Sequence, residues 1–262
     1  MQLYNNPCPK IYLLCDKFIE DKVELYDFVT AIPELEKYGT VDRQTMERTV
    51  GTTYKTKWED FMMEKATIME KAFDKKETSV FFTDCDICFM GPLPKIPEES
   101  KCSLALSPHL IRPMDEKRFG RFNAGFLWTS NPEVPGLWRK AAFTSRYYDQ
   151  AALEEVATKM ETYIFPKQTN YGWWRMYQGS ESYDALQKEW SVFRGDAQNH
   201  SGIKVNNDHL LSVHTHWHEK KDPLTTHFNK FVISKLQILE KGKHKNAQLF
   251  LNFLTNDLKI DM

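Results

Sequence analysis

One stretch of this chain, Phe81–Phe89, constrains the fold more than any other. Its apolar run is typical of a buried strand, but Asp84 and Asp86 interrupt it before it resumes. Burying two carboxylates without a partner costs free energy, and a bound cation is the simplest compensation. Carboxylate oxygens are ligands that suit Mg2+ or Mn2+, and these ions often hold phosphates as well. We therefore expect Asp84 and Asp86 to bind a divalent metal ion and, through it, a diphosphate.

The segments around this stretch predict an α/β fold. Lys57–Phe73 carries apolar residues at helical spacing, and the β-favouring run Ser79–Thr83 follows after a short polar break. A helix, a break, a buried strand and then acids at its carboxyl end are typical of α/β sheets, where ligands collect at the strand ends. Leu25–Tyr38 is expected to be a helix broken at Pro33. The remaining predicted strands are 11–15, 102–106, 122–128 and 210–214, and the remaining predicted helices are 133–143, 149–160, 225–239 and 246–254.

Composition limits the classes of function that the chain can have. Its 262 residues are 41% hydrophobic and 27% charged with a net charge of −1, so no basic field is available to collect nucleic acid. No run reaches the roughly 18 apolar residues of a membrane span. The N-terminus lacks a signal-peptide pattern, and the five cysteines, an odd number, suggest free thiols in a reducing compartment. We expect a soluble, cytoplasmic, single-domain protein over 1–262, with 221–262 as a helical C-terminal extension.

A histidine cluster is the second candidate for metal chemistry. If the strand that contains Val213 continues, His214 and His216 point to the same face, where two imidazoles can bind metal. One alternative is a surface histidine cluster, and another is a separate zinc site, for which spacing gives no third ligand. The economical interpretation is that one histidine completes the coordination begun by the two acids. Lys220 and Lys221 follow, either as phosphate contacts or as solvated charges.

Other interpretations of the acid motif are open. The two carboxylates can cap the next element, although proline rather than helical periodicity follows them. Haloacid-dehalogenase-type phosphatases also carry Asp-x-Asp after a strand, but they usually have Thr or Val where this chain has Cys88, and their motif lies near the start of the chain. Cys85 and Cys88 form a lone Cys-x-x-Cys, which is either a zinc or redox pair or two small apolar residues near a strand.

Four motifs in order resemble those of the GT-A glycosyltransferases. They are Phe-Thr-Asp-Cys-Asp-Ile-Cys-Phe-Met-Gly-Pro-Leu-Pro at 82–94, Phe-Asn-Ala-Gly-Phe-Leu-Trp at 122–128, Tyr-Asp-Gln-Ala-Ala-Leu at 148–153, and the late histidine strand. The chain is most similar to the nucleotide-diphospho-sugar transferases that include the glycogenin-like enzymes, over 11–221. The resemblance implies a Rossmann-like GT-A fold with a mixed, mostly parallel central sheet flanked by helices. It departs from that group in two places: the Gly and Lys-Pro-Trp after the histidine are absent, and Asp16 replaces polar residues after the first strand.

The resemblance also implies a substrate and a metal centre. The donor is a nucleotide-diphosphate sugar, either a UDP- or a GDP-sugar, and the acceptor is a saccharide or another molecule. Asp84, Asp86 and either His214 or His216 are expected to hold Mn2+ or Mg2+. Among further donor-binding residues, Asn123 and Gly125 match the motif that lines the donor sugar, and Lys57 matches a basic position near the donor.

Residues for catalysis and for acceptor binding follow from the same comparison. Asp149 and Gln150 match the pair near the reacting centre. A metal ion neutralises the charge that forms on the leaving diphosphate, and a carboxylate such as Asp149 can stabilise the oxocarbenium-like sugar or take the acceptor's proton. Asp149 as a helix cap and Asn123 as a turn former are the structural alternatives. Trp173 and Trp174 are candidates for stacking on the acceptor, with core packing as the alternative.

Overall fold

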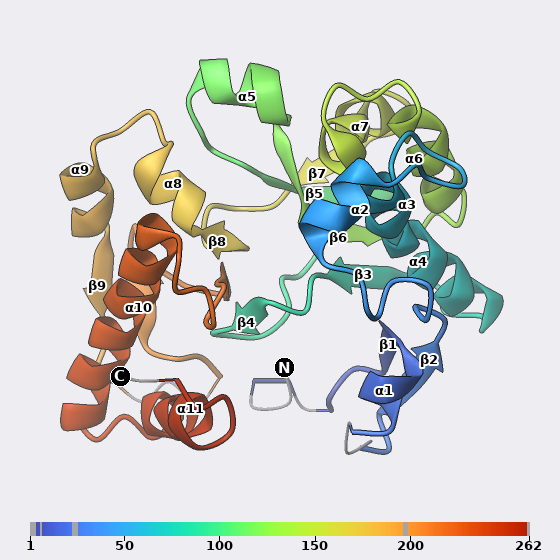
Figure 1. Cartoon of the computed structure of the whole chain (residues 1–262). Helices are drawn as coiled ribbons and strands as arrows, with labels where there is room; N and C mark the ends of the chain where they lie inside the picture. The colour runs from blue at the N-terminus through green and yellow to red at the C-terminus, as the bar shows by residue number, and fades with distance from the viewer. Residues whose placement is uncertain (1–3, 6, 23–25, 196–198, 261–262) are drawn as a thin grey trace.

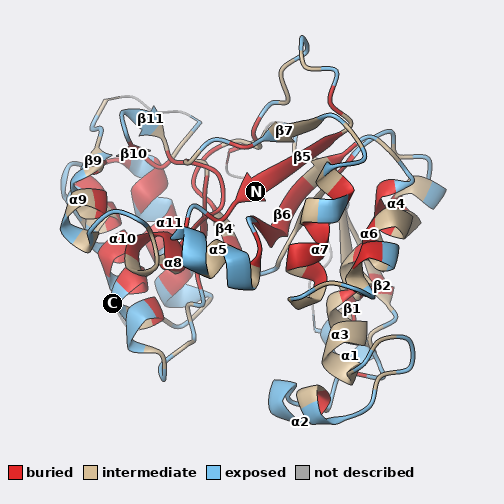
Figure 2. Ribbon diagram, turned by 90° about the horizontal axis from the view of Figure 1, so that it is seen from above, coloured by how far each residue is buried: buried red, intermediate tan, exposed pale blue. Residues whose placement is uncertain are grey.

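A four-stranded sheet carries the acid motif at one of its strand ends. The computed structural model describes residues 4–5, 7–22, 26–195 and 199–260 (Figure 1). The strand order is β3 (Val80–Thr83), β6 (Phe122–Thr129), β5 (Leu104–Pro108) and β7 (Thr162–Ile164). β6 runs antiparallel to both of its neighbours, and β7 runs parallel to β5. β5 and most of β6 are buried (Figure 2), which explains their continuous apolar sequences.

Helices cover one face of this sheet and form a core with it. They are α3 (Lys57–Met62), α4 (Glu64–Asp74), α6 (Val134–Ala142) and α7 (Tyr148–Ala157). α3 begins at a capping box in which the Thr56 side chain accepts from the backbone of Glu59, and Glu59 accepts from the backbone of Thr56. The single helix predicted over 57–73 is therefore two helices, because Met63 adopts a ψ of −2° and separates them. The core includes Met63, Ala66, Met69, Leu104, Leu106, Leu127, Trp138 and Leu153.

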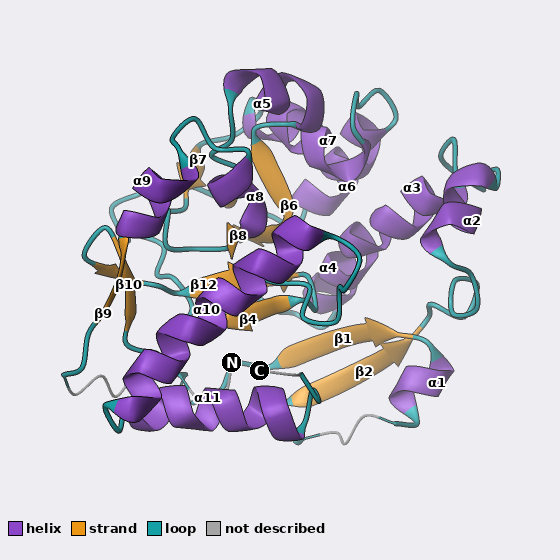
Figure 3. Cartoon of the chain, turned by 60° about the vertical axis from the view of Figure 1, so that its left-hand side comes forward, coloured by secondary structure: helices purple, strands orange, loops and turns teal. Residues whose placement is uncertain are grey.

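A second group of elements lies beyond β4 (Ile87–Phe89) on the other side of the molecule in Figure 1. β12 (Ser212–His214) pairs antiparallel with β4 and parallel with β8 (Tyr171–Gly172). A further antiparallel sheet consists of β9 (Trp190–Val192), β10 (Ile203–Val205) and β11 (Asp208–His209). The helices are α8 (Trp173–Tyr177), α9 (Tyr183–Lys188), α10 (Pro223–Lys241) and α11 (Lys245–Asn256). The predicted C-terminal helices are thus present, and they pack together (Figure 3) in a core of their own.

Two peripheral pieces complete the described chain. One is the parallel pair β1 (Ile11–Cys15) and β2 (Val29–Pro33) with α1 (Lys17–Glu20), and the other is α2 (Arg43–Arg48), which packs against α3. The prediction of a helix over 25–38 is wrong for its described part: Val29–Pro33 is a strand, rich in β-branched residues, and the proline ends it. Leu25 itself lies outside the described residues. The short helix α5 (Pro113–Phe119) connects β5 to β6.

The fold class is mixed α/β, but the sheet differs from the one expected. The described residues form four small sheets instead of one large, mostly parallel central sheet, and β1·β2, β5·β7 and β12·β8 are their parallel pairs. The chain leaves the first sheet at the acid motif, and β4 pairs with the distant β12. The direction of each strand depends on which distant strand it pairs with, and a local apolar pattern does not specify that partner. The parallel central sheet could therefore not be predicted reliably from the sequence. Among the described residues, no helix has the length and apolar character needed to cross a membrane.

Candidate metal centre

The acid motif occupies the bend between two sheets. β3 ends at Thr83 and β4 begins at Ile87, so 84–86 link them. The Asp84 backbone N–H donates to the Gly125 carbonyl at 2.8 Å, which keeps Asp84 beside β6. The Thr215 N–H donates to the Asp86 carbonyl at 3.1 Å, which fixes Asp86 beside the end of β12. The two acids therefore face different partners although only one residue separates them.

Asp86 meets both predicted histidines. Its Oδ1 lies 3.0 Å from His214 Nε2, and its Oδ2 lies 3.1 Å from His216 Nε2. One ligand atom from each of the three residues lies within 4.8 Å of the others. His214 is buried at the end of β12, whereas the His216 side chain is half exposed. Residues more than a hundred positions apart in the chain thus form a candidate metal-binding group with one open side.

The chemistry of these three residues fits a divalent cation. Asp86 Oδ1 is buried and accepts no hydrogen bond from any residue that the structure describes, although His214 Nε2 lies beside it. Burial alone raises the pKa of Asp86, but the two imidazoles outweigh burial and lower the pKa far below its usual range. The hydrogen bond to Asp86 raises the pKa of His216. A carboxylate with two imidazoles is a donor set that suits Mn2+ and other divalent transition metals.

Asp84, the other expected ligand, pairs with a lysine instead. Lys65 Nζ lies 3.3 Å from Asp84 Oδ1 and 2.9 Å from Asp149 Oδ2, and all three side chains are largely buried. Burial raises the pKa of Asp84, and the Lys65 ammonium offsets part of that rise. For Lys65, burial lowers the pKa, but the two carboxylates outweigh it and raise the pKa above its ordinary value. Asp84 is therefore outside the three-residue group, in a cluster of its own next to it.

Lys57, the lysine predicted near the donor, and Lys65, the lysine that pairs with the acids, lie in different places. Lys57 is the first residue of α3, and its ammonium lies 5.8 Å from the centre of the Tyr38 ring. Lys65, two turns further along, is on α4 and reaches the acids. In the sequence, Lys65 could have been noticed only because it follows Lys57 at a spacing that puts both lysines on a similar face of one straight helix. The break at Met63 changes the direction of that face.

Gly125 allows the metal group and the lysine cluster to lie side by side. A Cβ atom at this position would lie 2.6 Å from Asp84 Oδ2 and 2.8 Å from His214 Cε1. Both contacts are too short for a side chain, so only glycine lets the backbone of β6 come so close to both groups. The expected donor residue Gly125 thus has a geometric role at the junction of the two clusters.

Asn123, Asp149 and Gln150 also lie at this junction. Asn123 Nδ2 lies 3.4 Å from Gln150 Oε1, and Gln150 Nε2 donates to the Phe119 carbonyl at 2.9 Å. Asp149 does not cap α7, whose N-cap is Tyr147; it lies in the first helical turn, where its carboxylate faces Lys65. The structure thus brings these three predicted residues to the same region as the acids.

The two tryptophans lie in different environments. Trp174 is 8% exposed, donates its indole N–H to the His109 carbonyl at 3.2 Å, and places its ring 5.0 Å from that of His214, edge to face. It therefore forms part of the wall behind the metal ligand. Trp173 is partly buried and packs against the C-terminal core. Stacking of an acceptor on these rings stays a prediction.

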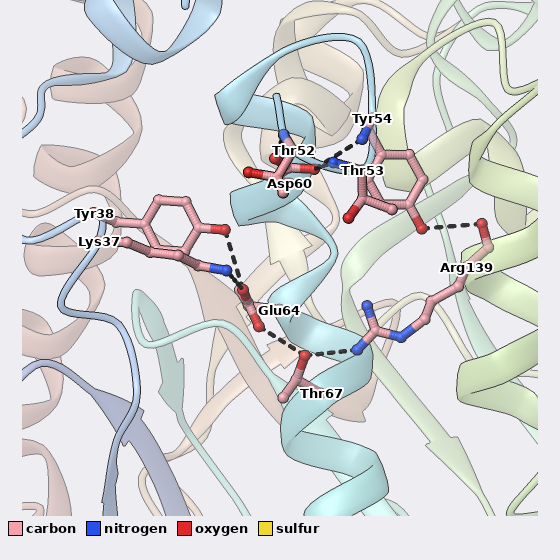
Figure 4. A pocket seen from close by; sticks show the side chains of 9 residues that line it. All are labelled: Lys37, Tyr38, Thr52, Thr53, Tyr54, Asp60, Glu64, Thr67 and Arg139. Atoms are coloured by element: carbon pink, nitrogen blue, oxygen red, sulfur yellow. Dashed lines mark hydrogen bonds and ion pairs between the residues drawn. The ribbon is translucent and has the colours of Figure 1, made fainter. Parts of the chain in front are cut away.

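Two further pockets lie outside these clusters. The pocket in Figure 4 has a volume of about 270 Å3 and is polar, but its acids already have partners: Glu64 pairs with Lys37 at 2.9 Å, and Asp60 accepts a hydrogen bond from the backbone N–H of Tyr54 at 2.9 Å. The other pocket, of about 430 Å3, follows the histidines in the chain and is lined by Lys220, Lys221, Pro223, Thr226, His227 and Lys230. Its basic character suits an anion.

Comparison of the chain with models of protein families gave no match, and comparison with curated proteins gave none either.

Proposed function

We propose that this protein is a metal-dependent glycosyltransferase of GT-A type, which moves a sugar from a nucleotide-diphosphate sugar to an acceptor. The observation that carries the proposal is the convergence of Asp86 with His214 and His216 beside the Asp84–Lys65–Asp149 cluster. Sugar transfer from a diphosphate needs a cation that neutralises the leaving diphosphate and a carboxylate that acts on the sugar or the acceptor. A cation-binding group next to a buried carboxylate held by a lysine supplies both. The resemblance of the four sequence motifs supports the same reaction.

The metal group would hold a divalent ion through Asp86 and the two histidines, and its two imidazoles favour a transition metal such as Mn2+ over Mg2+, which prefers oxygen ligands. When bound, the ion neutralises the negative charge that develops on the leaving diphosphate. Asp86 is suited to this role because each of its carboxylate oxygens lies beside one of the two histidines. Lys220 and Lys221 line a pocket just after His216 in the chain, and their ammonium groups would hold phosphate oxygens. The expected donor is a UDP- or GDP-sugar.

The neighbouring cluster would act on the sugar. The ion pair with Lys65 orients the Asp149 carboxylate, which can stabilise positive charge on the sugar or accept the proton of the acceptor. Asn123 and Gln150, whose amide groups lie 3.4 Å apart, would line the site of the sugar. Asp84 belongs to this cluster through its ion pair with Lys65, and its Oδ2 lies beside the Gly125 backbone, as does the His214 ring.

The proposal is tested by the release of nucleoside diphosphate from a panel of UDP- and GDP-sugars in the presence of Mn2+. We expect release with at least one donor, and its loss in Asp86→Asn. Asp74→Asn, a change at an exposed acid at the end of α4, is the matched control and should retain the activity. Hydrolysis of phosphomonoesters instead would identify a phosphatase. Binding of a sugar nucleotide without turnover, with any metal and acceptor, would identify a binding module.

A further inference from the structure

A chain of hydrogen bonds connects the β6 backbone to the metal ligand His214. It begins at the backbone N–H of Gly125, which lies 3.0 Å from the side-chain oxygen of Asn123. A backbone N–H can only donate, so the oxygen of the Asn123 amide, and not its nitrogen, must face it. This contact fixes the orientation of an amide that is otherwise ambiguous.

The orientation of Asn123 determines the next amide. Asn123 Oδ1 also lies 2.9 Å from the side-chain nitrogen of Asn170, so the Asn170 amide donates to it. The oxygen of Asn170 therefore faces His214 Nδ1, at 3.0 Å. Because this oxygen only accepts, Nδ1 of His214 must carry the ring proton. The other nitrogen, Nε2, faces Asp86 and is the one left to bind a cation.

An independent contact agrees with this orientation of Asn123. His109 Nδ1 lies 2.6 Å from the Gly120 carbonyl, which only accepts, so Nδ1 of His109 carries the proton. Its Nε2 is then an acceptor, and Asn123 Nδ2 lies 3.4 Å from it. Burial lowers the pKa of His109 to about 4, which keeps the ring neutral near pH 7 and its Nε2 able to accept.

We propose that Asn170 is a positioning residue that holds His214 in its Nδ1–H tautomer and so presents Nε2 to the metal ion. Metal-binding histidines require the second ring nitrogen to be held by an acceptor, which fixes both the tautomer and the orientation of the ring. The inference rests on the metal-binding part of the proposed function, but not on the identity of the substrate.

The protein holds Asn170 rigidly. The residue is fully buried at a φ of +53°, a left-handed conformation that asparagine tolerates better than most residues. Its backbone N–H donates to Ser212 Oγ at 2.8 Å, and its side-chain nitrogen lies 3.2 Å from Ser107 Oγ. These contacts fix both the backbone and the amide plane of the residue.

Arg175 fixes the segment that precedes Asn170. It is 1% exposed and has no ion pair with an acid among the residues that the structure describes. Its Nη2 donates to the carbonyls of Pro108 at 2.7 Å and Thr169 at 3.2 Å, and its Nη1 donates to that of Lys167. The guanidinium thus ties the end of β5 to the loop that presents Asn170.

The test compares Mn2+ affinity, measured by calorimetric titration, in three variants. Asn170→Gly removes the amide while keeping the left-handed backbone accessible. Asn170→Asp keeps an acceptor towards His214 but loses the donor towards Asn123. Asn207→Gly, at an exposed asparagine that is also left-handed (φ of 69°) and lies between β10 and β11, is the matched control. We expect Mn2+ to bind roughly 10–100-fold more weakly to Asn170→Gly, close to the wild-type affinity in Asn170→Asp, and unchanged in Asn207→Gly.

The ring proton gives a second readout, which needs no variant to fold. In the wild-type protein bound to diamagnetic Mg2+ or Zn2+, nitrogen-15 NMR of the imidazole should place the His214 proton on Nδ1. A proton on Nε2, or wild-type affinity in a folded Asn170→Gly, would overturn the inference. Equal weakening in the Gly and Asp variants would also overturn it, since that indicates a general packing role. If no sugar nucleotide is turned over while these metal-binding results hold, the proposed function fails and the inference stands.

Discussion

Lys65 and Asp149 form a buried ion pair, with Nζ 2.9 Å from Oδ2. The same ammonium lies 3.3 Å from Asp84 Oδ1, so one lysine serves two carboxylates from different elements. A buried charge that loses its partner is costly, which makes this lysine important for the fold as well as for the site. It also explains how Asp84 and Asp149 can both be largely buried near each other.

Replacement of Lys65 by methionine should therefore destabilise the protein strongly. Lys65→Met leaves Asp84 and Asp149 buried without a cation, and we expect a loss of about 3–5 kcal/mol in the free energy of unfolding. Lys57→Met, the matched change at the lysine that the sequence favoured, should alter it by about 0.5 kcal/mol or less. Urea denaturation of the two variants measures both values. Equal stability of the two variants would contradict the importance of the ion pair.

Bound metal should stabilise the folded protein. If Asp86, His214 and His216 bind Mn2+ only when they are brought together by folding, an ion at 100 times its Kd adds about 2.7 kcal/mol. The melting temperature should rise on addition of Mn2+ and return to its starting value with excess chelator. His214→Ala should show no such rise. A metal-dependent rise in that variant equal to the wild-type rise would place the ion elsewhere.

Two glycine-to-alanine changes should have opposite effects. Gly125→Ala places a Cβ 2.6 Å from Asp84 Oδ2 and 2.8 Å from His214 Cε1, so it should weaken Mn2+ binding and cost about 1–3 kcal/mol of stability. Gly136→Ala in α6 meets no atom within 4 Å and should stabilise the protein by about 0.5–1 kcal/mol. Thermal unfolding of both variants, with and without Mn2+, tests the pair. A neutral effect of Gly125→Ala on both stability and metal binding would contradict the close approach.

The neutral state of His109 should make stability depend on pH. Its pKa is lowered by burial to about 4 in the folded protein, whereas an unfolded histidine has a pKa near 6.5. Between these values the unfolded chain binds more protons, so the His109 contribution to stability is complete above pH 6.5 and is lost as the pH falls towards 4. The loss is on the order of 3 kcal/mol.

The measurement is the difference between the wild-type protein and His109→Gln, followed by chemical denaturation from pH 7.5 to pH 4. The wild-type free energy of unfolding should fall more steeply than that of the variant over this range, because other acid-sensitive groups are common to both proteins. Parallel curves would show that His109 titrates normally in the folded state.

The part of the candidate site that could be predicted consists of residues with a clear local pattern at the ends of strands. Asp86 was visible because an acid inside an apolar run needs a compensating partner, and His214 and His216 because alternate residues of a strand share a face. Asp149 and Gln150 came from the resemblance rather than from local pattern. The helices α6, α7, α10 and α11 lie close to their predicted ranges because their apolar periodicity extends over several turns.

The missed parts depend on tertiary structure. Lys65 lies on a second helix because the helix breaks at Met63. The apolar periodicity of this segment continues through Met63 and gives no sign of the break. Asn170 adopts a left-handed conformation in a loop, where no periodic signal exists. The pairing of β4 with β12 brings together strands more than a hundred residues apart. The arrangement of the sheets could therefore not be predicted from local sequence patterns.

The position of β4 has a consequence for how the protein unfolds. Ile87 and Phe89 pack with Phe126 on the first sheet, whereas Cys88 packs against the C-terminal core. Asp86, at the start of this strand, shares its carboxylate with histidines that belong to the C-terminal half. A cation held there would join the acid motif, beside the first sheet, to histidines of the C-terminal half. Loading the centre with metal is therefore expected to make the unfolding of these two parts more cooperative.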